Sequence, residues 1–478
     1  MAQAEAAQPA PQQEDGPPAA AQDALLAAAR ADDRAGIQAA IANGADPAAA
    51  NSRALRVAAE AGALDAVMLL IERGADPSAD GHAAFRAAVA ARHYPVQKHL
   101  HESGHQPDLL APERRAEIAA MRAELDTAPE IYRPSRFWET FGDANVSWLS
   151  WAGLENFKRT INQNYFNFVI RGFRDPRIRR SLALWRRGAL LAPLRTAIAD
   201  PDDDPALWFS MDPRYRIFPG DRADARRLKR LLYRLMVGAQ WGYAERRPAG
   251  AWLRGMQEPA LGNPIPLTRR GRPVSQDLVN SACEAAELEA AMAAAGQSLP
   301  QDEAAAPPVV AELGAGYGRL GWLLLSKRRL RYMIFDIPPT LMVAQWYLSS
   351  LFPDRKVFRF RHFDSFAEIE AELAEAEIAF FSANQLELMP DGMIDAFVSI
   401  SALHEMTRPQ IAHYLSLMGA KTRSAVYLKL QRIYRNPFDE MVLERDAYAM
   451  PPGWRLWREA DDPLNPGFFT LSLLRETP

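Results

Sequence analysis

The C-terminal part of the sequence predicts an α/β fold in which a mostly parallel sheet ends in an antiparallel hairpin. First, an apolar run at 309–313 leads directly into a glycine-rich turn and an apolar helix, as a buried parallel strand does. Second, strand-like and helix-like runs alternate from there to residue 430. Third, the last two strand-like runs, 454–457 and 468–474, are joined only by the polar loop 461–467, so they form a hairpin.

The elements of this region follow one another in a regular order. The turn after the first strand contains Gly314, Gly316, Gly318 and Gly321, and the helix begins near Leu320. Because glycines allow positive φ and close approach of a ligand, and the helix start presents free N–H groups, we expect a ribose or phosphate group there. Further strands are predicted at 332–335, 378–382, 393–401 and 425–430, and helices at 339–352 and 408–420.

One class of ligand that fits the glycine turn is a redox dinucleotide. The spacing Gly316-x-Gly318-x-x-Gly321 matches the dinucleotide fingerprint, and Asp336 follows the next strand, where a ribose-binding acid belongs. This interpretation indicates an NAD(P)- or flavin-dependent oxidoreductase. A dinucleotide-binding domain usually continues with a second βαβαβ half, for which no chain is left.

The other interpretation starts from Glu312-x-Gly314-x-Gly316-x-Gly318, which resembles the first motif of class I S-adenosylmethionine-dependent methyltransferases. The resemblance implies a Rossmann-like domain at 301–478 with a seven-stranded, mostly parallel sheet and a C-terminal hairpin. It also implies that S-adenosylmethionine is the cofactor, that Glu312 and the glycines hold its methionine end, and that Asp336 binds its ribose. The predicted hairpin favours this interpretation.

Composition excludes several classes of protein. The chain has 478 residues, 48% of them hydrophobic, and a net charge of −3, which argues against a protein that coats nucleic acid or an anionic membrane. The single cysteine, Cys283, rules out an internal disulfide and a cysteine-based zinc site. No run approaches the ~20 apolar residues of a membrane span, and the N-terminus does not resemble a signal peptide. We expect a cytoplasmic protein.

The N-terminal region is predicted to contain an internal repeat. Residues 1–20 carry no large apolar residue after Met1, and we expect a disordered lead-in. Within 21–110, Gly44, Gly74 and Gly104 recur every 30 residues, each after two helix-like runs. The units resemble ankyrin repeats, although the usual period is 33 and the Thr-Pro-Leu-His opening is missing. They predict either a surface that docks a protein partner or a structural cap.

Residues 111–300 are predicted to form a helical cap and substrate-binding region. An aromatic cluster at 137–168 contains the candidate substrate-binding residues Asn156, Lys158 and Asn162, because rings and amides together suit a carbohydrate, although such clusters are more often core. The arginine-rich stretch 171–260 predicts solvated helix faces. Gln276 and Asp277 are further substrate candidates in the polar stretch before a helix at 282–295, where Ser275 or Asp277 alternatively caps the helix.

A narrower resemblance covers roughly residues 131–478. The segments WAGLENFKRTIN from Trp151, LGNP from Leu261, SQDL from Ser275, ELGAGYG and SALHEM from Ser401 together resemble the bacterial sugar O-methyltransferase family. The resemblance implies a helical N-terminal extension over the site and methyl transfer to a hydroxyl of a carbohydrate or glycan precursor.

Methyl transfer to a hydroxyl benefits from a general base. His404 and Glu405 follow a strand at the carboxyl edge of the predicted sheet, where ligands bind in open α/β folds. Since the usual pKa of histidine suits the task, we predict His404 as base, with Glu405 either orienting it or contacting the substrate. The alternatives are that His404 only starts a helix, or that a metal binds His404, Glu405, Asp364 or His362; the spacing does not favour a metal site.

The remaining site residues follow from strand order. If the third strand is 378–382, Asn384 and Gln385 contact the adenine; if it is 357–362, Asp364 does so, and we prefer the first. Ser401 is a further cofactor contact, and Lys429, near the end of the fifth strand, is a candidate substrate contact. A hypothesis from another class is an ankyrin-type interaction protein whose methyltransferase domain is degenerate.

Overall fold

The computed structural model describes residues 19–91, 93–105, 108–160, 176–186, 195–199, 223–301, 306–436 and 438–476. The chain divides into two compact units, Met1–Pro107 and Asp108–Pro478. Among the described residues, no helix has the length and apolar character needed to cross a membrane.

The first unit consists of three helix pairs. Each pair is followed by a glycine at positive φ, with values of 93° at Gly44, 97° at Gly74 and 76° at Gly104, which a residue with a Cβ adopts only at a cost. The predicted unit of two helices and a glycine-led loop thus occurs three times, while its assignment to the ankyrin family stays a prediction. The pairs are α1 (Ala19–Arg30) with α2 (Arg34–Ala42), α3 (Ala49–Ala61) with α4 (Leu64–Glu72), and α5 (Ala79–Ala90) with α6 (Tyr94–Glu102).

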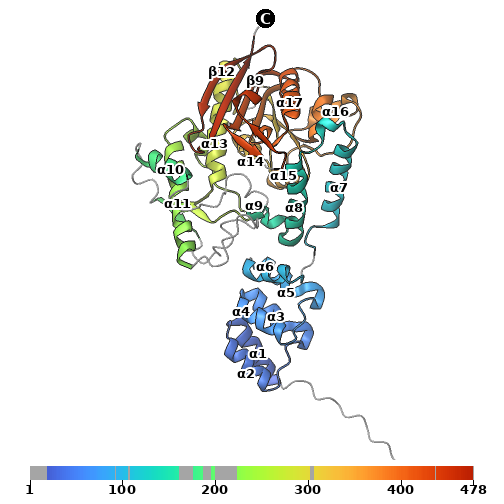
Figure 1. Cartoon of the computed structure of the whole chain (residues 1–478), viewed down its shortest axis with the longest axis vertical. Helices are drawn as coiled ribbons and strands as arrows, with labels where there is room; N and C mark the ends of the chain where they lie inside the picture. The colour runs from blue at the N-terminus through green and yellow to red at the C-terminus, as the bar shows by residue number, and fades with distance from the viewer. Residues whose placement is uncertain are drawn as a thin grey trace, which may run out of the picture. The chain divides into compact units, whose positions relative to one another are not determined.

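The second unit is built around an eight-stranded sheet (Figure 1). Its order is β12-β13-β9-β8-β4-β5-β7-β6, and only the pairs that involve β13 are antiparallel. The prediction of a mostly parallel sheet with a C-terminal hairpin is confirmed. The strands are β4 (Val309–Leu313), β5 (Arg331–Asp336), β6 (Val357–Phe358), β7 (Ile378–Ser382), β8 (Ile394–Ile400), β9 (Thr422–Gln431), β12 (Trp454–Asp461) and β13 (Phe468–Arg475).

The expected count of seven strands is wrong by one. The additional strand is β6, a two-residue edge strand that pairs with β7 and not with β5. The strand beside β5 is therefore β7, whose bounds coincide with the run predicted at 378–382. The other seven strands of the sheet include one that runs antiparallel to its neighbours, β13, which lies between β9 and β12.

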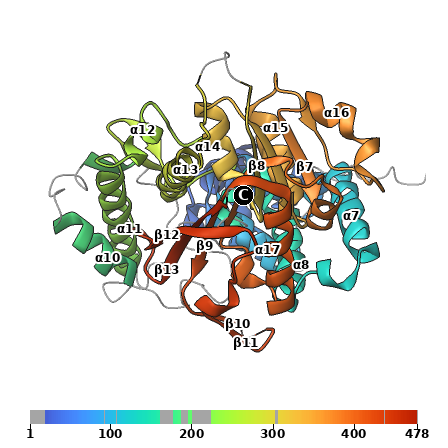
Figure 2. The same cartoon turned by 90° about the horizontal axis from the view of Figure 1, so that it is seen from above.

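Two apolar cores cover the two faces of the sheet, because side chains alternate along each buried strand. Tyr332 and Ile334 of β5 belong to one core, and Met333 and Phe335 belong to the other. Figure 2 shows helices on both sides of the strands. The first face packs against α13 (Gln276–Ala294), α14 (Arg319–Lys327) and α15 (Thr340–Leu351), and the second against α16 (Glu370–Glu375) and α17 (Arg408–Lys421).

The described part of residues 111–300 is mostly helical, and its role as a cap and substrate-binding region stays a prediction. Ser275 is the N-cap of α13, and its side chain accepts a hydrogen bond from the Leu278 N–H, so the capping interpretation of this residue is confirmed. The helix begins six residues earlier than predicted. The other elements of the cap are α7 (Pro112–Thr127), α8 (Arg136–Ala152), α9 (Phe157–Thr160), α10 (Pro176–Arg186), β1 (Thr196–Ile198), α11 (Ala223–Ala244), α12 (Ala249–Leu253), β2 (Leu267–Arg269) and β3 (Arg272–Val274).

Candidate functional site

The glycine turn after β4 has the backbone that its sequence predicts. Gly314, Gly316 and Gly318 have φ values of 74°, 60° and 82°. A Cβ on Gly314 would collide with the Cβ of Ala402, so this position excludes every other residue on steric grounds as well. The turn therefore lies tightly against the loop that follows β8.

Asp336 ends β5 and joins this turn from the neighbouring strand. Its carboxylate accepts hydrogen bonds from the Gly316 N–H at 2.8 Å and from the Ile337 N–H at 2.7 Å. Burial raises the pKa of Asp336 to about 7 although these bonds act in the opposite direction. Asp336 is thus bonded directly to the glycine turn, while its assignment to a ribose stays a prediction.

Glu312, the acid before the glycines, is also buried. The Tyr332 hydroxyl donates to it at 2.5 Å, yet burial raises the pKa of Glu312 to about 7. Together with Gly314, Gly316 and Arg319 it lines a space of about 10 Å³. Glu312 and Asp336 thus lie on two sides of the same turn.

A second cavity, of about 50 Å³, opens over the carboxyl edge of the sheet. Its lining combines Gly314, Asp336, Ser401 and Glu405 of the sheet domain with residues of the segment 132–138, which we name the strap. The structure therefore brings together predicted site residues from the ends of β4, β5 and β8. This convergence follows from parallel pairing, which places the carboxyl ends of neighbouring strands at one edge.

The resemblance implied an N-terminal extension over the site, but the sequence did not indicate that the strap would be the part that lines this cavity. Ser135 donates to the Glu405 carbonyl oxygen at 2.9 Å, and the Gln410 side chain donates to the Arg133 carbonyl at 2.7 Å. The Tyr132 hydroxyl donates to Glu387 at 2.6 Å. These partners lie more than 250 residues away in sequence, so no local pattern indicates them; the only signal was the aromatic cluster that includes Trp138.

The two residues predicted as catalytic have different surroundings. Glu405 lines the cavity and accepts a hydrogen bond from the Trp138 side chain; burial raises the pKa of Glu405 to about 8, and that bond acts against the rise. His404 does not line it. Its Nδ1 accepts from the Gln431 N–H at 3.3 Å, its ring packs on Tyr434, and burial lowers its pKa to about 3. Glu405 is thus the residue of the pair that faces the cavity with a pKa near neutrality.

The predicted adenine contacts lie just beyond β7. The Asn384 side chain donates to Glu124 of α7 at 2.8 Å, and Glu124 also contacts His362 at 2.6 Å. Gln385 is fully buried, and its amide caps the turn at Ser382 and donates to the Arg361 carbonyl. Ala383 between Ser382 and Asn384 lines the cavity.

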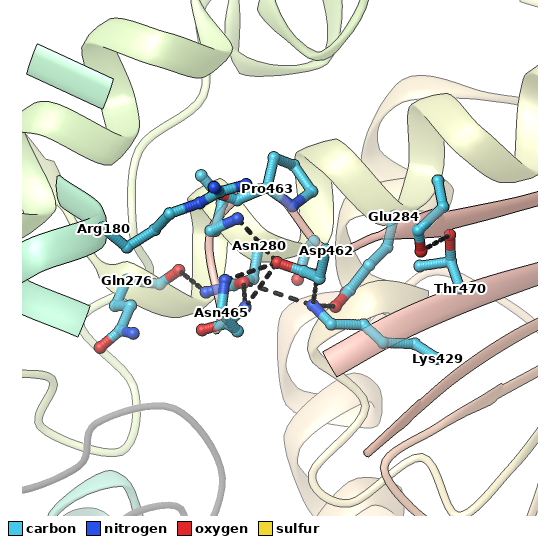
Figure 3. Close-up of polar contacts among 12 residues, drawn as sticks. Arg180, Gln276, Asn280, Glu284, Lys429, Asp462, Pro463, Asn465 and Thr470 are labelled. Atoms are coloured by element: carbon cyan, nitrogen blue, oxygen red, sulfur yellow. Dashed lines mark hydrogen bonds and ion pairs between the residues drawn. The ribbon is translucent and has the colours of Figure 1, made fainter. Parts of the chain in front are cut away.

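Lys429 of β9 belongs to a buried network of charged side chains (Figure 3). Its ammonium group contacts Asp462 at 2.6 Å and Glu284 at 2.9 Å, and Arg319 contacts Glu284 at 2.5 Å. Burial raises the pKa of Glu284, but the two cations outweigh it and bring the value to about 2. This network, which we name the Lys429 network, joins β9, α13, α14 and the loop between β12 and β13.

The other predicted substrate residues lie in the cap. Lys158 is buried, with Glu258 at 2.5 Å and the Tyr347 ring centroid at 4.8 Å. Asn156 accepts from Asn263 at 2.9 Å. The Tyr317 hydroxyl donates to Asp277 at 2.9 Å, and the side chain of fully buried Gln276 points away from Asn280 in Figure 3. Asn162 lies outside the described residues.

The alternative of a metal site requires several ligand side chains close together. Within the part of the chain that the structure describes, no three His, Cys, Asp or Glu side chains are grouped so that they could hold a metal ion. The Nε2 atom of His362 lies 3.3 Å from Oδ1 of Asp364. His404 and Glu405 lie in the turn that follows β8.

Comparisons with known proteins give partial structural likenesses. No family model matches the chain, and no curated protein matches it. A magnesium protoporphyrin IX methyltransferase from Synechocystis, solved with bound SAM, is 14% identical, with a TM-score of 0.27 over 42% of this chain and 85% of that one. A SAM-dependent methyltransferase from Aquifex aeolicus is 16% identical, with a TM-score of 0.24 over 35% of this chain and 82% of that one. The fold assignment rests on the strand order of the chain itself.

Proposed function

We propose that this protein is an S-adenosylmethionine-dependent O-methyltransferase that methylates a sugar hydroxyl. The observation that carries the methyltransferase assignment is the insertion of antiparallel β13 between β9 and β12, in a sheet whose parallel strands bring a glycine turn and Asp336 together. A dinucleotide-binding domain continues instead with parallel strands and crossover helices. The sugar acceptor rests on the sequence resemblance described above.

The residues around the turn suit a nucleoside with a charged tail. The Asp336 carboxylate, at the tip of β5, is a hydrogen-bond acceptor of the kind that binds a ribose diol. The Ser401 hydroxyl oxygen and the Oε2 atom of Glu405 are buried and have no hydrogen-bond partner among the described residues, and both side chains line the same cavity. Such atoms cost free energy unless a ligand bonds them, which supports a polar ligand here.

When bound, the cofactor would supply a methyl group whose bond to sulfur breaks as a bond to the acceptor oxygen forms. The chain has to orient the acceptor, exclude water and take the hydroxyl proton. We assign the last role to Glu405, because it lines the cavity and its pKa of about 8 suits proton transfer near neutral pH. His404, with a pKa of about 3, accepts protons poorly at that pH and keeps its neutral ring in the backbone contact with Gln431.

The strap has to move for this function. Ligand pockets usually measure ~300 to 1,000 Å³, whereas the cavity beneath the strap holds about 50 Å³. Trp138 and Ser135 contact Glu405 directly, so displacement of the strap would both open the cavity and release the carboxylate. The strap then closes over the reactants and excludes water.

Isothermal titration of the full chain with S-adenosylmethionine, S-adenosylhomocysteine and NAD tests the proposal. We expect binding of the first two and none of NAD, and loss of binding in Asp336→Ala. Asp391→Ala is the matched control, since Asp391 is an exposed acid that does not line the cavity beneath the strap. Binding of NAD alone would establish the oxidoreductase alternative, and binding of none of the three would favour the interaction protein. Incubation with labelled S-adenosylmethionine and a panel of sugars and sugar precursors then tests the acceptor.

A further inference from the structure

The cap contains a third cavity, which shares no lining residue with the cavity beneath the strap. Its volume is about 1050 Å³, and it lies between the end of α11, α12 and the hairpin of β2 and β3. Figure 2 shows α11 and α12 beside α13. Among the residues that the structure describes, the lining contains seven arginines and one carboxylate, that of Glu245.

The single carboxylate is already neutralised inside the wall of the cavity. Arg269 is buried and donates to both oxygens of Glu245, at 2.9 and 2.8 Å, and to the Thr196 hydroxyl at 3.1 Å. This bidentate pair ties the hairpin to the end of α11. Within the described part of the chain the ion pair of Glu245 is with Arg269, while Arg270 and Arg195 act on its carboxylate only through weaker electrostatic attraction.

Four of those arginines are exposed and have no ion pair. Among the described residues, no carboxylate lies within ion-pair distance of Arg246, Arg254, Arg270 or Arg272. Arg247 stacks on the Tyr243 ring, with its guanidinium carbon 3.5 Å from the ring centroid, which holds a further positive charge at the rim. Several guanidinium groups around one cavity, without an ion-pair partner in the part of the chain that the structure describes, repel one another, so an anion between them is favoured.

Arg270, at the tip of the hairpin between β2 and β3, has a backbone conformation that costs free energy. Arg270 has a φ of 51° and Gly271 a φ of 78°, so both residues between the strands lie in the left-handed region, as a tight hairpin turn requires. Asparagine and glycine occupy this first position at lower cost than arginine does, by about 1 kcal/mol. A long cationic side chain at such a position is more readily explained by binding than by folding.

The volume of the cavity and the side chains that line it indicate which class of ligand fits. Guanidinium groups match the oxygen atoms of phosphate in a bidentate way, and the cavity is far larger than one phosphate. Buried Trp241, Leu253 and Val274 form an apolar part of the lining. We propose that this cavity binds a ligand that carries a diphosphate group, either inorganic or attached to a nucleoside. The proposal does not depend on the methyltransferase assignment.

Titration calorimetry of the full chain tests this with inorganic pyrophosphate, uridine diphosphate and uridine, each in the presence of saturating S-adenosylhomocysteine. We expect the two diphosphates to bind with an affinity that falls as salt rises, and uridine not to bind. The double variant Arg270→Glu/Arg272→Glu should weaken binding about tenfold or more. The matched control is Arg359→Glu/Arg455→Glu, because both arginines are exposed and lie outside this cavity.

The two diphosphates distinguish the source of the group. Equal affinity would assign the bare diphosphate, and tighter binding of uridine diphosphate would assign a nucleotide. Binding of neither, or unchanged binding in the double variant, would overturn the proposal. The neutral variant Arg254→Gln, expected to weaken binding severalfold, serves if the charge-reversed protein does not fold. Binding of S-adenosylhomocysteine to each variant is measured separately, so failure here is distinct from failure of the proposed function.

Discussion

Replacement of Lys429 by methionine tests whether this residue is a structural cation, as its surroundings indicate. The Lys429 side chain is 1% exposed and lies 2.6 Å from Asp462 and 2.9 Å from Glu284. Glu284 keeps Arg319 in the variant, whereas the partners that Asp462 retains among the described residues are backbone N–H groups and the Asn465 side chain. Removal of one partner from a buried pair usually costs about 3 to 5 kcal/mol, because the other charge remains buried.

The free energy of unfolding can be measured for the second unit alone. All 11 tryptophans of the chain lie in that unit, between Trp138 and Trp457, so urea unfolding followed by tryptophan fluorescence reports on it selectively. The matched control is Lys421→Met. Lys421 is mostly buried, but its partner Asp391 is 75% exposed, so we expect a loss below about 1 kcal/mol.

A double variant separates the pair from other effects of the substitution. In Lys429→Met/Asp462→Asn no uncompensated carboxylate remains, and much of the lost stability should return. The pH dependence has a defined sign. Because the pKa of Glu284 is lowered to about 2, its contribution is present above pH 4.5 and is lost as the pH falls toward 2. A loss of less than about 1 kcal/mol in Lys429→Met at neutral pH would refute the reasoning.

Three further predictions concern the cavity beneath the strap. Asp336→Asn should stabilise the ligand-free protein by up to about 4 kcal/mol at pH 8, measured by urea unfolding, because the pKa of Asp336 is raised from 3.8 to about 7. The gain in stability should vanish near pH 4, and a gain that persists at pH 4 would contradict this cause. Glu405→Gln should lower kcat by about 100-fold or more and remove the rise of kcat toward pH 8 in a methyl-transfer assay, whereas an unchanged pH profile would exclude Glu405 as base. Gly314→Ala should lower the Tm more than Gly296→Ala, since both glycines have a φ of 74° but only Gly314 would collide with a neighbour; equal effects would mean that the loop at Ala402 adapts.

The sequence identified the elements whose signals are local. The strand 309–313 and the strand 378–382 have the predicted bounds, because each is a continuous apolar run between turn residues. The contact between Asp336 and the glycine turn was also predictable, since parallel neighbouring strands end at one edge. These features need only the order of residues along the chain.

The features that the sequence did not indicate depend on distant partners. Lys429 and Lys158 are lysines of the kind that can contact a substrate, but whether a lysine faces solvent or a buried carboxylate depends on other elements of the fold. The carboxylates concerned are Glu258 for Lys158, and Glu284 and Asp462 for Lys429. The strap contacts Glu405 across some 270 residues, and no periodicity links the two segments. The spacing of His404 and Glu405 does not indicate which of the two side chains lines the cavity. That depends on the direction in which each side chain leaves the short turn after β8.

Both edges of the sheet resist further strand pairing. β6 offers only two residues, and Lys356 and Arg359 flank it. β12, at the opposite edge, carries exposed Arg455 and Arg458, and an irregularity between Leu456 and Arg458 interrupts its ladder. Short, charged or bulged edges are poor templates for a strand from another molecule. The central parallel strands can therefore be rich in buried apolar residues without giving the folded protein a tendency to polymerise edge to edge.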